Sequence, residues 1–395
     1  MRHPAVLIAL PAIVLGVSAV ANAQAPSQAL ASSHVTLAAR DGVKLKATYY
    51  AAAKPGPGIL LLHQCNSTRQ SWTALATRAA ARGYHVLAMD YRGFGESGGE
   101  RPTTGPEQQA VVAQQWPGDV DAAFAWLTAQ PGVDKARIAA AGASCGVNQS
   151  LLAARRHPEI KTVVLLSGGA TPAAREHLAR TPDLPVFAAA SHGDGGAVEG
   201  MRWILQWSVN RYNTFLEYQA AGHGTEMFAV EKGLEPAILD WLDARLRTAP
   251  AQPLTSAATA APSRVQAFWD ALARPDAEAR ARQLMAEARR DDPKYILFPE
   301  GELNLYGYQV MQDDPNHAIW LFKLNVEAYP KSANPHDSLA DAYLAAGKPK
   351  EALQHAEKAL EMLPADAGLG DEFRARVKAS AEQKVRDLKK AGTER

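Results

Sequence analysis

The chain has no excess of charge of either sign. Its 42 Lys and Arg residues nearly balance its 41 Asp and Glu residues, so neither a basic surface for nucleic acid nor an acidic tail is expected. No group of His, Cys and Asp residues has the spacing of metal ligands, so we expect no metal and no cofactor. Long apolar runs are missing after residue 23, so no stable membrane span should remain once that segment is removed.

The first 23 residues have the pattern of a secretory signal peptide. Arg2 and His3 precede an apolar stretch over residues 5–20, and Ala-Asn-Ala follows directly before Gln24. A charged start, a short apolar segment and small residues at a cleavage point are typical of such peptides. An uncleaved membrane anchor is the alternative, although the stretch is short for a span. We therefore expect a mature protein that begins near Gln24 and is exported, either periplasmic or secreted.

Residues 24–248 alternate between strand and helix patterns. A hairpin is predicted around Asp41-Gly42, and short apolar runs typical of strands buried on both faces follow it. Helical patterns separate these runs, which indicates a doubly wound, mostly parallel sheet of the α/β class. The strands expected after the hairpin cover residues 58–62, 84–89, 137–141, 161–166, 185–190 and 214–218, and one helix over 226–247 closes the domain.

The composition changes at Thr248. Residues 249–263 are rich in Ala, Pro, Thr and Ser and are predicted to be a linker. Residues 264–395 have helical periodicity only, and two similar segments within them end at Pro330 and Pro364, 34 residues apart. This spacing is the period of tetratricopeptide repeats, so we predict an all-helical, tetratricopeptide-like domain that could bind a protein or peptide partner. An ordinary helical hairpin is the alternative.

A Gly-Ala-Ser-Cys-Gly motif at residues 142–146 indicates a catalytic site. It follows the strand-like run 137–141 and precedes a helical stretch over 147–154. In this strand–turn–helix setting G-x-S-x-G is a nucleophile elbow, in which Ser144 sits at a sharp turn with a strained backbone. Glycines are needed because larger side chains would collide with the neighbouring strand and helix. An ordinary glycine-rich turn is the alternative.

Three further motifs accompany the elbow. They are His-Gln-Cys-Asn at 63–66, Asp-Tyr-Arg-Gly-Phe-Gly-Glu-Ser at 90–97 and Gly-His-Gly at 222–224. Their order resembles the α/β-hydrolase superfamily, in particular its dienelactone-hydrolase-like members, over about residues 35–248. The resemblance implies a serine hydrolase that cleaves an ester or related acyl bond through an acyl-enzyme.

The resemblance also implies a catalytic triad in the chain order serine, acid, histidine. Serine is a weak nucleophile and needs a base that is itself oriented by a carboxylate. Ser144 would be the nucleophile, His223 the base and Asp194 the acid. For Asp194 the alternative is a cap of the helix that follows it. Dienelactone hydrolases use a cysteine at the centre of the elbow, so Cys145, one residue away, is the alternative nucleophile.

An oxyanion hole of two backbone N–H groups is the other implied feature. The first donor would be Cys145, directly after the nucleophile. The second would be Cys65, with Gln64 as the alternative donor. Gln64 stands where the family usually has glycine, so the position of the second donor is open.

Candidate substrate-binding residues are His63, Trp72 and Trp116, although core packing would suit the two tryptophans equally well. Residues 99–116 could partly cover the site. The expected substrate is a small acyl compound. A serine peptidase or amidase is one alternative function, and a partner-binding protein whose helical repeats carry the function is another.

Cys65 and Cys145 are the two cysteines of the chain, and donors that point at one oxygen atom must lie close together. An exported protein folds in an oxidising compartment, so we expect these residues to form a disulfide, with two reduced thiols as the alternative. Each half of the chain has its own apolar pattern. We therefore expect residues 24–248 to fold and to act on small esters alone, and residues 264–290 to form capping helices that could dock onto the hydrolase domain.

Overall fold

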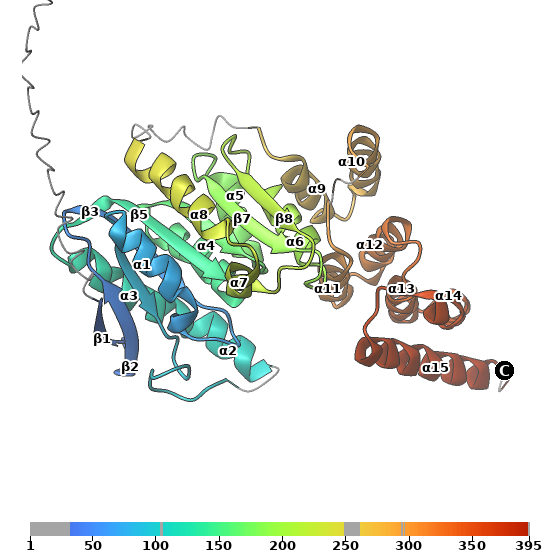
Figure 1. Cartoon of the computed structure of the whole chain (residues 1–395). Helices are drawn as coiled ribbons and strands as arrows, with labels where there is room; N and C mark the ends of the chain where they lie inside the picture. The colour runs from blue at the N-terminus through green and yellow to red at the C-terminus, as the bar shows by residue number, and fades with distance from the viewer. Residues whose placement is uncertain (1–31, 103–105, 249–260, 294, 296, 394–395) are drawn as a thin grey trace, which may run out of the picture.

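The computed structural model describes residues 32–102, 106–248, 261–293, 295 and 297–393. The predicted signal peptide and most of the predicted linker lie outside these ranges. Within them, no helix combines the length and the apolar character that crossing a membrane requires. Figure 1 shows a sheet flanked by helices, with an all-helical part beside it.

The sheet has eight strands in the order β1-β2-β4-β3-β5-β6-β7-β8. β1 and β2 form the predicted hairpin, β2 pairs antiparallel with β4, and all other neighbours are parallel. The predicted mostly parallel α/β sheet is therefore confirmed. The strands are β1 (Ser32–Ala38), β2 (Lys44–Tyr50), β3 (Gly56–Leu62), β4 (His85–Met89), β5 (Val133–Ala143), β6 (Ile160–Leu166), β7 (Val186–Ser191) and β8 (Thr214–Tyr218).

The central strands are apolar throughout because both faces of the sheet are covered. In β3, Leu60 and Leu62 belong to one core cluster, whereas Ile59 and Leu61 belong to a second cluster on the opposite face. Side chains alternate between the faces of a strand, so a continuous apolar run is what two covered faces require.

One helix predicted from the sequence is broken in the structure. The single helix expected over 226–247 is wrong, because the chain leaves helical angles at Glu231 (φ −96°, ψ 86°) and restarts after Gly233. Glycine is a poor helix former, which favours the break. The helices are η1 (Arg69–Trp72), α1 (Thr73–Ala81), α2 (Pro106–Gln114), α3 (Trp116–Ala129), α4 (Cys145–Arg156), α5 (Pro172–Arg180), α6 (Ala197–Leu205), η2 (Gly224–Glu226), α7 (Met227–Val230), α8 (Leu234–Leu242) and η3 (Asp243–Thr248).

The C-terminal part is all-helical, as predicted. Its first helix begins directly after Ser263, whose hydroxyl accepts a hydrogen bond from Gln266 N at 3.1 Å. Two helix pairs then repeat, because α13 and α14 begin 34 residues after α11 and α12. The helices are α9 (Arg264–Leu272), α10 (Glu278–Asp291), α11 (Glu300–Met311), α12 (Pro315–Ala328), α13 (Asn334–Ala345), α14 (Pro349–Met362), η5 (Leu363–Ala365) and α15 (Asp371–Thr393).

The two parts share one hydrophobic core. The guanidinium carbon of Arg175 in α5 lies 4.4, 5.6 and 5.8 Å from the ring centroids of Trp203, Trp207 and Trp269. Trp203 and Trp207 belong to the sheet domain and Trp269 to α9. The indole N–H groups of Trp203 and Trp269 both donate to Leu297 O, at 2.9 and 3.0 Å. One apolar cluster runs through this contact, so the expected docking of the first C-terminal helices is confirmed.

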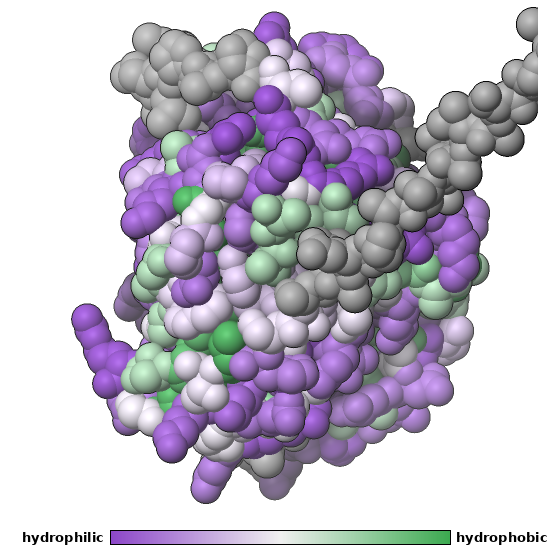
Figure 2. All heavy atoms as spheres, turned by 60° about the vertical axis from the view of Figure 1, so that its left-hand side comes forward, coloured by the Kyte–Doolittle hydropathy of each residue, from purple (hydrophilic) through white to green (hydrophobic). Residues whose placement is uncertain are grey.

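Few large apolar side chains remain on the surface. The face in Figure 2 is mostly polar, with small scattered apolar areas. Among the described residues, the exposed large apolar side chains are Val209, Val230, Leu305, Leu344 and Phe373. The tryptophans at the contact between the two parts are not among them, so docking removes them from water.

Candidate active site

Ser144 occupies the turn between β5 and α4. Its backbone angles, φ 52° and ψ −116°, are rare for a residue with a side chain, and such strain costs about 1–3 kcal/mol. A Cβ at Gly142 would overlap Gly146 O, and a Cβ at Gly146 would overlap Leu62 O at the end of β3. Both glycines of the motif are therefore needed for close approach, as the sequence predicts. Ser144 itself is half-buried.

His223 and Asp194 lie at the same edge of the sheet as Ser144. Asp194 follows β7 and His223 follows β8, and the carboxyl ends of parallel strands meet at one edge. His223 Nδ1 and Asp194 Oδ2 are 2.7 Å apart. The alternative role of Asp194 as a helix cap does not apply, because Gly196 caps α6 and no side chain bonds there. The two residues predicted to be the base and the acid are thus paired.

The loop of His223 also touches the elbow. A Cβ at Gly224 would lie 3.2 Å from Cβ of Ala143, the residue before Ser144. His223 N donates to Glu226 Oε2 at 3.1 Å, which holds the following turn. The side chain of His223 is 34% exposed, so it can meet a substrate.

Cys65 and Cys145 form a disulfide, with their Cα atoms 5.8 Å apart. The predicted pairing is confirmed, and the alternative of two free thiols is not observed. Cys145 is the first residue of α4, where a backbone N–H has no partner within the helix and lies at the positive end of the helix dipole. The disulfide therefore joins the loop after β3 to the helix end that carries this donor.

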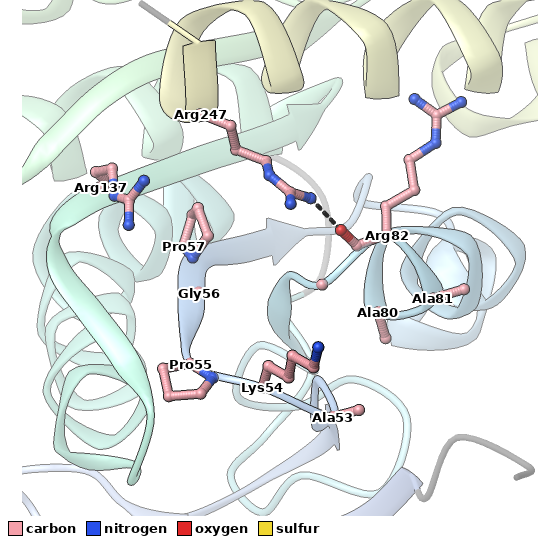
Figure 3. Close-up of a pocket in the computed structure, with 11 residues that line it drawn as sticks. Ala53, Lys54, Pro55, Gly56, Pro57, Ala80, Ala81, Arg82, Arg137 and Arg247 are labelled. Carbon is pink, nitrogen blue, oxygen red and sulfur yellow. Dashed lines mark hydrogen bonds between the residues drawn. The ribbon is translucent and has the colours of Figure 1, made fainter. Parts of the chain in front are cut away.

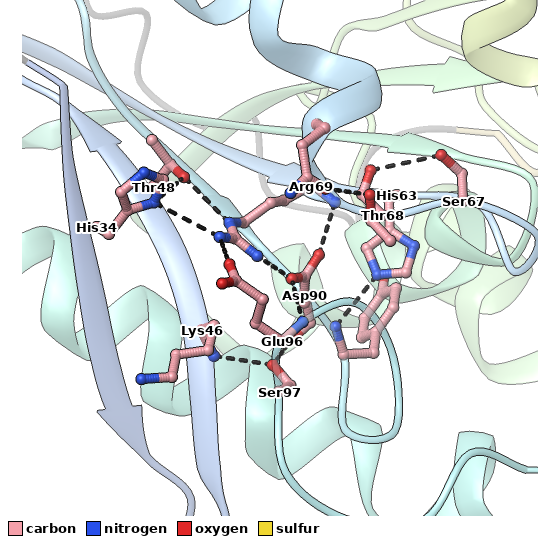
Figure 4. A network of polar contacts seen from close by, with 12 residues as sticks. His34, Lys46, Thr48, His63, Ser67, Thr68, Arg69, Asp90, Glu96 and Ser97 are labelled. Atoms are coloured by element: carbon pink, nitrogen blue, oxygen red, sulfur yellow. Dashed lines mark hydrogen bonds and ion pairs between the residues drawn. The ribbon is translucent and has the colours of Figure 1, made fainter.

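A buried ion pair anchors the loop after β3. Both carboxylate oxygens of Asp90 bond Arg69, one through Arg69 N at 2.7 Å and the other through its guanidinium. Arg69 also donates to Thr48 Oγ1 at 3.0 Å and pairs with Glu96 (Figure 4). Removing one partner would leave a buried charge unpaired, at a cost of about 3–5 kcal/mol. This pairing gives Asp90 of the Asp-Tyr-Arg-Gly motif a structural role, and the sequence alone did not reveal Arg69 as its partner.

His63 is a core residue, which corrects its expected role in substrate binding. Its side chain is 0% exposed. Nε2 accepts a hydrogen bond from Tyr91 N at 3.2 Å, so the ring proton is on Nδ1 and is donated to Gln64 O at 2.7 Å. Burial lowers the pKa of His63 to about 4, so the ring is neutral at neutral pH. It supports the loop and does not reach a substrate.

Trp72 and Trp116 need the same correction. Both side chains are 0% exposed. Trp116 stacks on Tyr91 with ring centroids 3.8 Å apart, and Trp72 packs edge-on against Phe228 at 5.7 Å. A substrate cannot contact either ring in this conformation.

Arg101 is a residue near the site that the sequence analysis missed. Its Nη2 lies 3.5 Å from Cys65 O, and its guanidinium carbon lies 4.6 Å from the ring centroid of Phe94. The side chain is exposed and brings a positive charge over the loop after β3. A single arginine outside the recognised motifs gives no sequence signal of this placement.

A pocket of about 590 Å³ lies at the opposite edge of the sheet (Figure 3). Its lining includes Lys54, Arg82, Arg137 and Arg247 and none of the predicted site residues. Among the described residues, no group of three or more His, Cys, Asp or Glu side chains is arranged to hold a metal ion.

Residues 41–195 match the family model of X-Pro dipeptidyl-peptidase (S15 family). This segment contains Ser144 and Asp194 but not His223. An uncharacterized protein of Mycobacterium tuberculosis, found with the same figures in two strains, is 33% identical over 131 residues, which are 32% of this chain and 43% of that protein. The chain thus spans less than half the length of these relatives.

Similar solved structures include an esterase of Pyrococcus furiosus, with 19% identity over 55% of this chain and 92% of that one and a TM-score of 0.45. A dienelactone hydrolase from Anabaena variabilis has 19% identity over 55% of this chain and 99% of that one, with a TM-score of 0.43.

The assignment of the fold class depends on features of this chain and on the family model that it matches. Its strand order, its nucleophile elbow after β5 and the matched family model agree with one another. Residues 32–248 therefore have an α/β-hydrolase-type fold, and residues 41–195 within them match a hydrolase family model.

Proposed function

We propose that the protein is a serine esterase in which Ser144, His223 and Asp194 form a catalytic triad. The observation that supports this most directly is the 2.7 Å contact between His223 and Asp194, at the sheet edge that also holds the strained elbow. Strain at a turn that exposes a serine hydroxyl is typical of this class of nucleophile.

The reaction follows from these roles. Ser144 Oγ attacks the ester carbonyl carbon while His223 Nε2 accepts its proton, and Asp194 holds the ring through Nδ1–H. Backbone N–H groups of Cys145 and Cys65 bind the developing oxyanion. The C–O bond then breaks, and the alcohol leaves with the proton from His223. Water releases the acyl group by the same route.

The first test is hydrolysis of p-nitrophenyl acetate by the wild type and by Ser144→Ala. Loss of a triad nucleophile lowers kcat by about 10⁴-fold or more. Ser150→Ala is the matched control, since its buried hydroxyl has no hydrogen-bond partner among the described residues and lies outside the triad. Ester hydrolysis that survives Ser144→Ala would contradict the proposal.

A peptidase acting on X-Pro peptides is the second candidate, and the match of residues 41–195 favours it. An amide differs from an ester mainly in its leaving group, which His223 must protonate more fully. Comparing an X-Pro-p-nitroanilide with p-nitrophenyl esters at equal enzyme concentration decides between them. Faster turnover of the anilide would identify a peptidase.

The disulfide gives a separate prediction. Reducing it should lower kcat by about tenfold or more, because the two oxyanion donors lose their fixed spacing. Closing a loop between cysteines with a sequence separation of 80 also stabilises the fold by up to about 4–5 kcal/mol in a loop-entropy model. The Cys65→Ala/Cys145→Ala double variant is the control, since its lower activity should not respond to reductant.

Intact mass after alkylation under non-reducing conditions measures the bond itself. No alkylation is expected in protein purified from an oxidising compartment. Two alkylated thiols there, or full activity after complete reduction, would contradict the prediction.

We also infer that the protein is exported through residues 1–23 and that the helical repeats recruit a protein or peptide. The disulfide supports export, because such bonds persist mainly in oxidising compartments. The 34-residue offset between the two helix pairs supports the repeat assignment. N-terminal sequencing of protein from the periplasm or medium, expected to begin near Gln24, tests the first inference.

A further inference from the structure

The side chain of Gln64 links two loops that meet at the candidate active site. The oxyanion loop is defined here as residues 63–68, and the histidine loop as residues 222–226. Gln64 Oε1 accepts hydrogen bonds from Thr225 N at 2.8 Å and from Thr225 Oγ1 at 3.0 Å. Gln64 Nε2 donates to Asn66 Oδ1 at 2.9 Å. The side chain amide therefore bonds across 161 residues of sequence and also within its own loop.

This link is buried. Gln64 is 2% exposed and Thr225 is 8% exposed, so water does not replace these bonds readily. Within the histidine loop itself, Glu226 N donates to His223 O at 3.0 Å, and His223 N donates to the exposed carboxylate of Glu226 at 3.1 Å. Loss of the Gln64 amide would leave the N–H and hydroxyl of Thr225 unsatisfied in the interior, which is costly for any buried polar group.

The histidine loop is shaped around this amide. Gly224 has φ +57°, and a Cβ there would overlap Gln64 Oε1. A side chain at position 224 would thus displace the amide from Thr225. A glycine at position 64, the usual residue in the resembling family, could form none of these bonds.

We propose that Gln64 is a positioning residue for His223. Its amide fixes the histidine loop against the oxyanion loop and so sets the distance between the base and the nucleophile. Asp194 holds one nitrogen of the His223 ring, while Gln64 holds the backbone that carries the ring. This role rests on the proposed triad, in which His223 transfers the proton of Ser144.

The test compares Gln64→Met with Gln149→Met in the full chain. Methionine has a similar length but offers no comparable hydrogen bond to Thr225. Gln149 is the matched control, because it is 0% exposed and its Nε2 donates to Val112 O at 3.1 Å, away from the histidine loop. Both variants lose a buried amide, so both should lose stability.

Only Gln64→Met should lose catalysis. We expect kcat for p-nitrophenyl acetate to fall by about 10- to 100-fold, because a small misplacement of a catalytic group has effects of this size. KM should stay within about twofold, since the substrate does not contact the amide. A purely structural role would not separate kcat from KM in this way.

Milder variants keep the inference testable if Gln64→Met fails to fold. Thr225→Ser retains the hydroxyl and should keep kcat near that of the wild type. Thr225→Val removes one of the two hydrogen bonds to Gln64. Its kcat should fall less than that of Gln64→Met but clearly more than that of Thr225→Ser. Equal kcat for the serine and valine variants would overturn the inference.

The experiments distinguish failure of the proposed function from failure of the inference about Gln64. Hydrolysis that survives Ser144→Ala overturns the proposed function and this inference together. Hydrolysis that depends on Ser144 but is unchanged in Gln64→Met, or falls equally in Gln149→Met, overturns the inference alone.

Discussion

His223→Ala should reduce kcat for a p-nitrophenyl ester by about 10⁴-fold or more, and Asp194→Asn by about 10⁴-fold. In the proposed triad, loss of the imidazole leaves no group to take the proton of Ser144, and loss of the carboxylate removes the group that holds the preferred tautomer of the ring. Both side chains are partly exposed, 34% for His223 and 19% for Asp194, so folding should change little. Stopped assays with a chemical denaturation curve for each variant measure both effects.

His192→Ala is the matched control for this pair. His192 lies in the same loop as Asp194, is exposed, and has its Nε2 3.5 Å from Glu217. Its replacement should leave kcat within about twofold of the wild type, since a surface substitution away from the site has a small effect. A variant lacking His223 that keeps more than a tenth of wild-type kcat would be incompatible with a histidine base.

Ending the chain at Thr248 should strongly destabilise the hydrolase domain. Trp203 and Trp207 are 2% and 8% exposed in the whole chain and would face water once α9 is removed. Each fully buried large apolar side chain contributes about 1.5–3 kcal/mol, so several such losses approach the whole stability of a domain. This contact revises the expectation that residues 24–248 fold and act on esters alone.

Point variants distinguish the effect of the Trp203–Trp269 contact on stability from that of the rest of the helical domain. Trp269→Ala removes an aromatic ring that lies 5.9 Å from Trp203, whereas Tyr343→Ala removes a ring that stacks on His355 within the repeats. Trp269→Ala should lower the temperature at which ester activity is lost, and Tyr343→Ala should leave it nearly unchanged. If the 24–248 fragment is soluble and unfolds at the wild-type temperature, the shared core is not needed.

The α/β sheet can be predicted from the sequence because each strand has a recognisable apolar pattern over a few consecutive residues. Runs such as residues 58–62 are apolar at every position, and this pattern requires a strand with both faces covered. The elbow is similarly local, since Gly142 and Gly146 are needed for contacts within a few residues or with the neighbouring strand. Local patterns of this kind, together with the resemblance to the α/β hydrolases, select Ser144, Asp194 and His223 as the candidate triad.

Contacts between distant segments could not be predicted in this way. Trp72 and Trp116 are compatible with a pocket or a core, and only the three-dimensional packing shows that they are buried. The tryptophan contacts of Arg175 and the bonds between Gln64 and Thr225 join residues far apart in the chain. A single sequence records which residues are apolar or polar but not which surface each one meets.

Labelling with a fluorophosphonate probe, followed by peptide mapping, tests the central claim most directly. The probe reacts with a serine only when a neighbouring base activates it, so it reports the nucleophile and its surroundings in one measurement. We predict one modified residue, Ser144, with labelling lost in Ser144→Ala and strongly slowed in His223→Ala. Labelling that persists in Ser144→Ala, or that maps to another residue of the wild type, would contradict the assignment of Ser144 as the catalytic nucleophile.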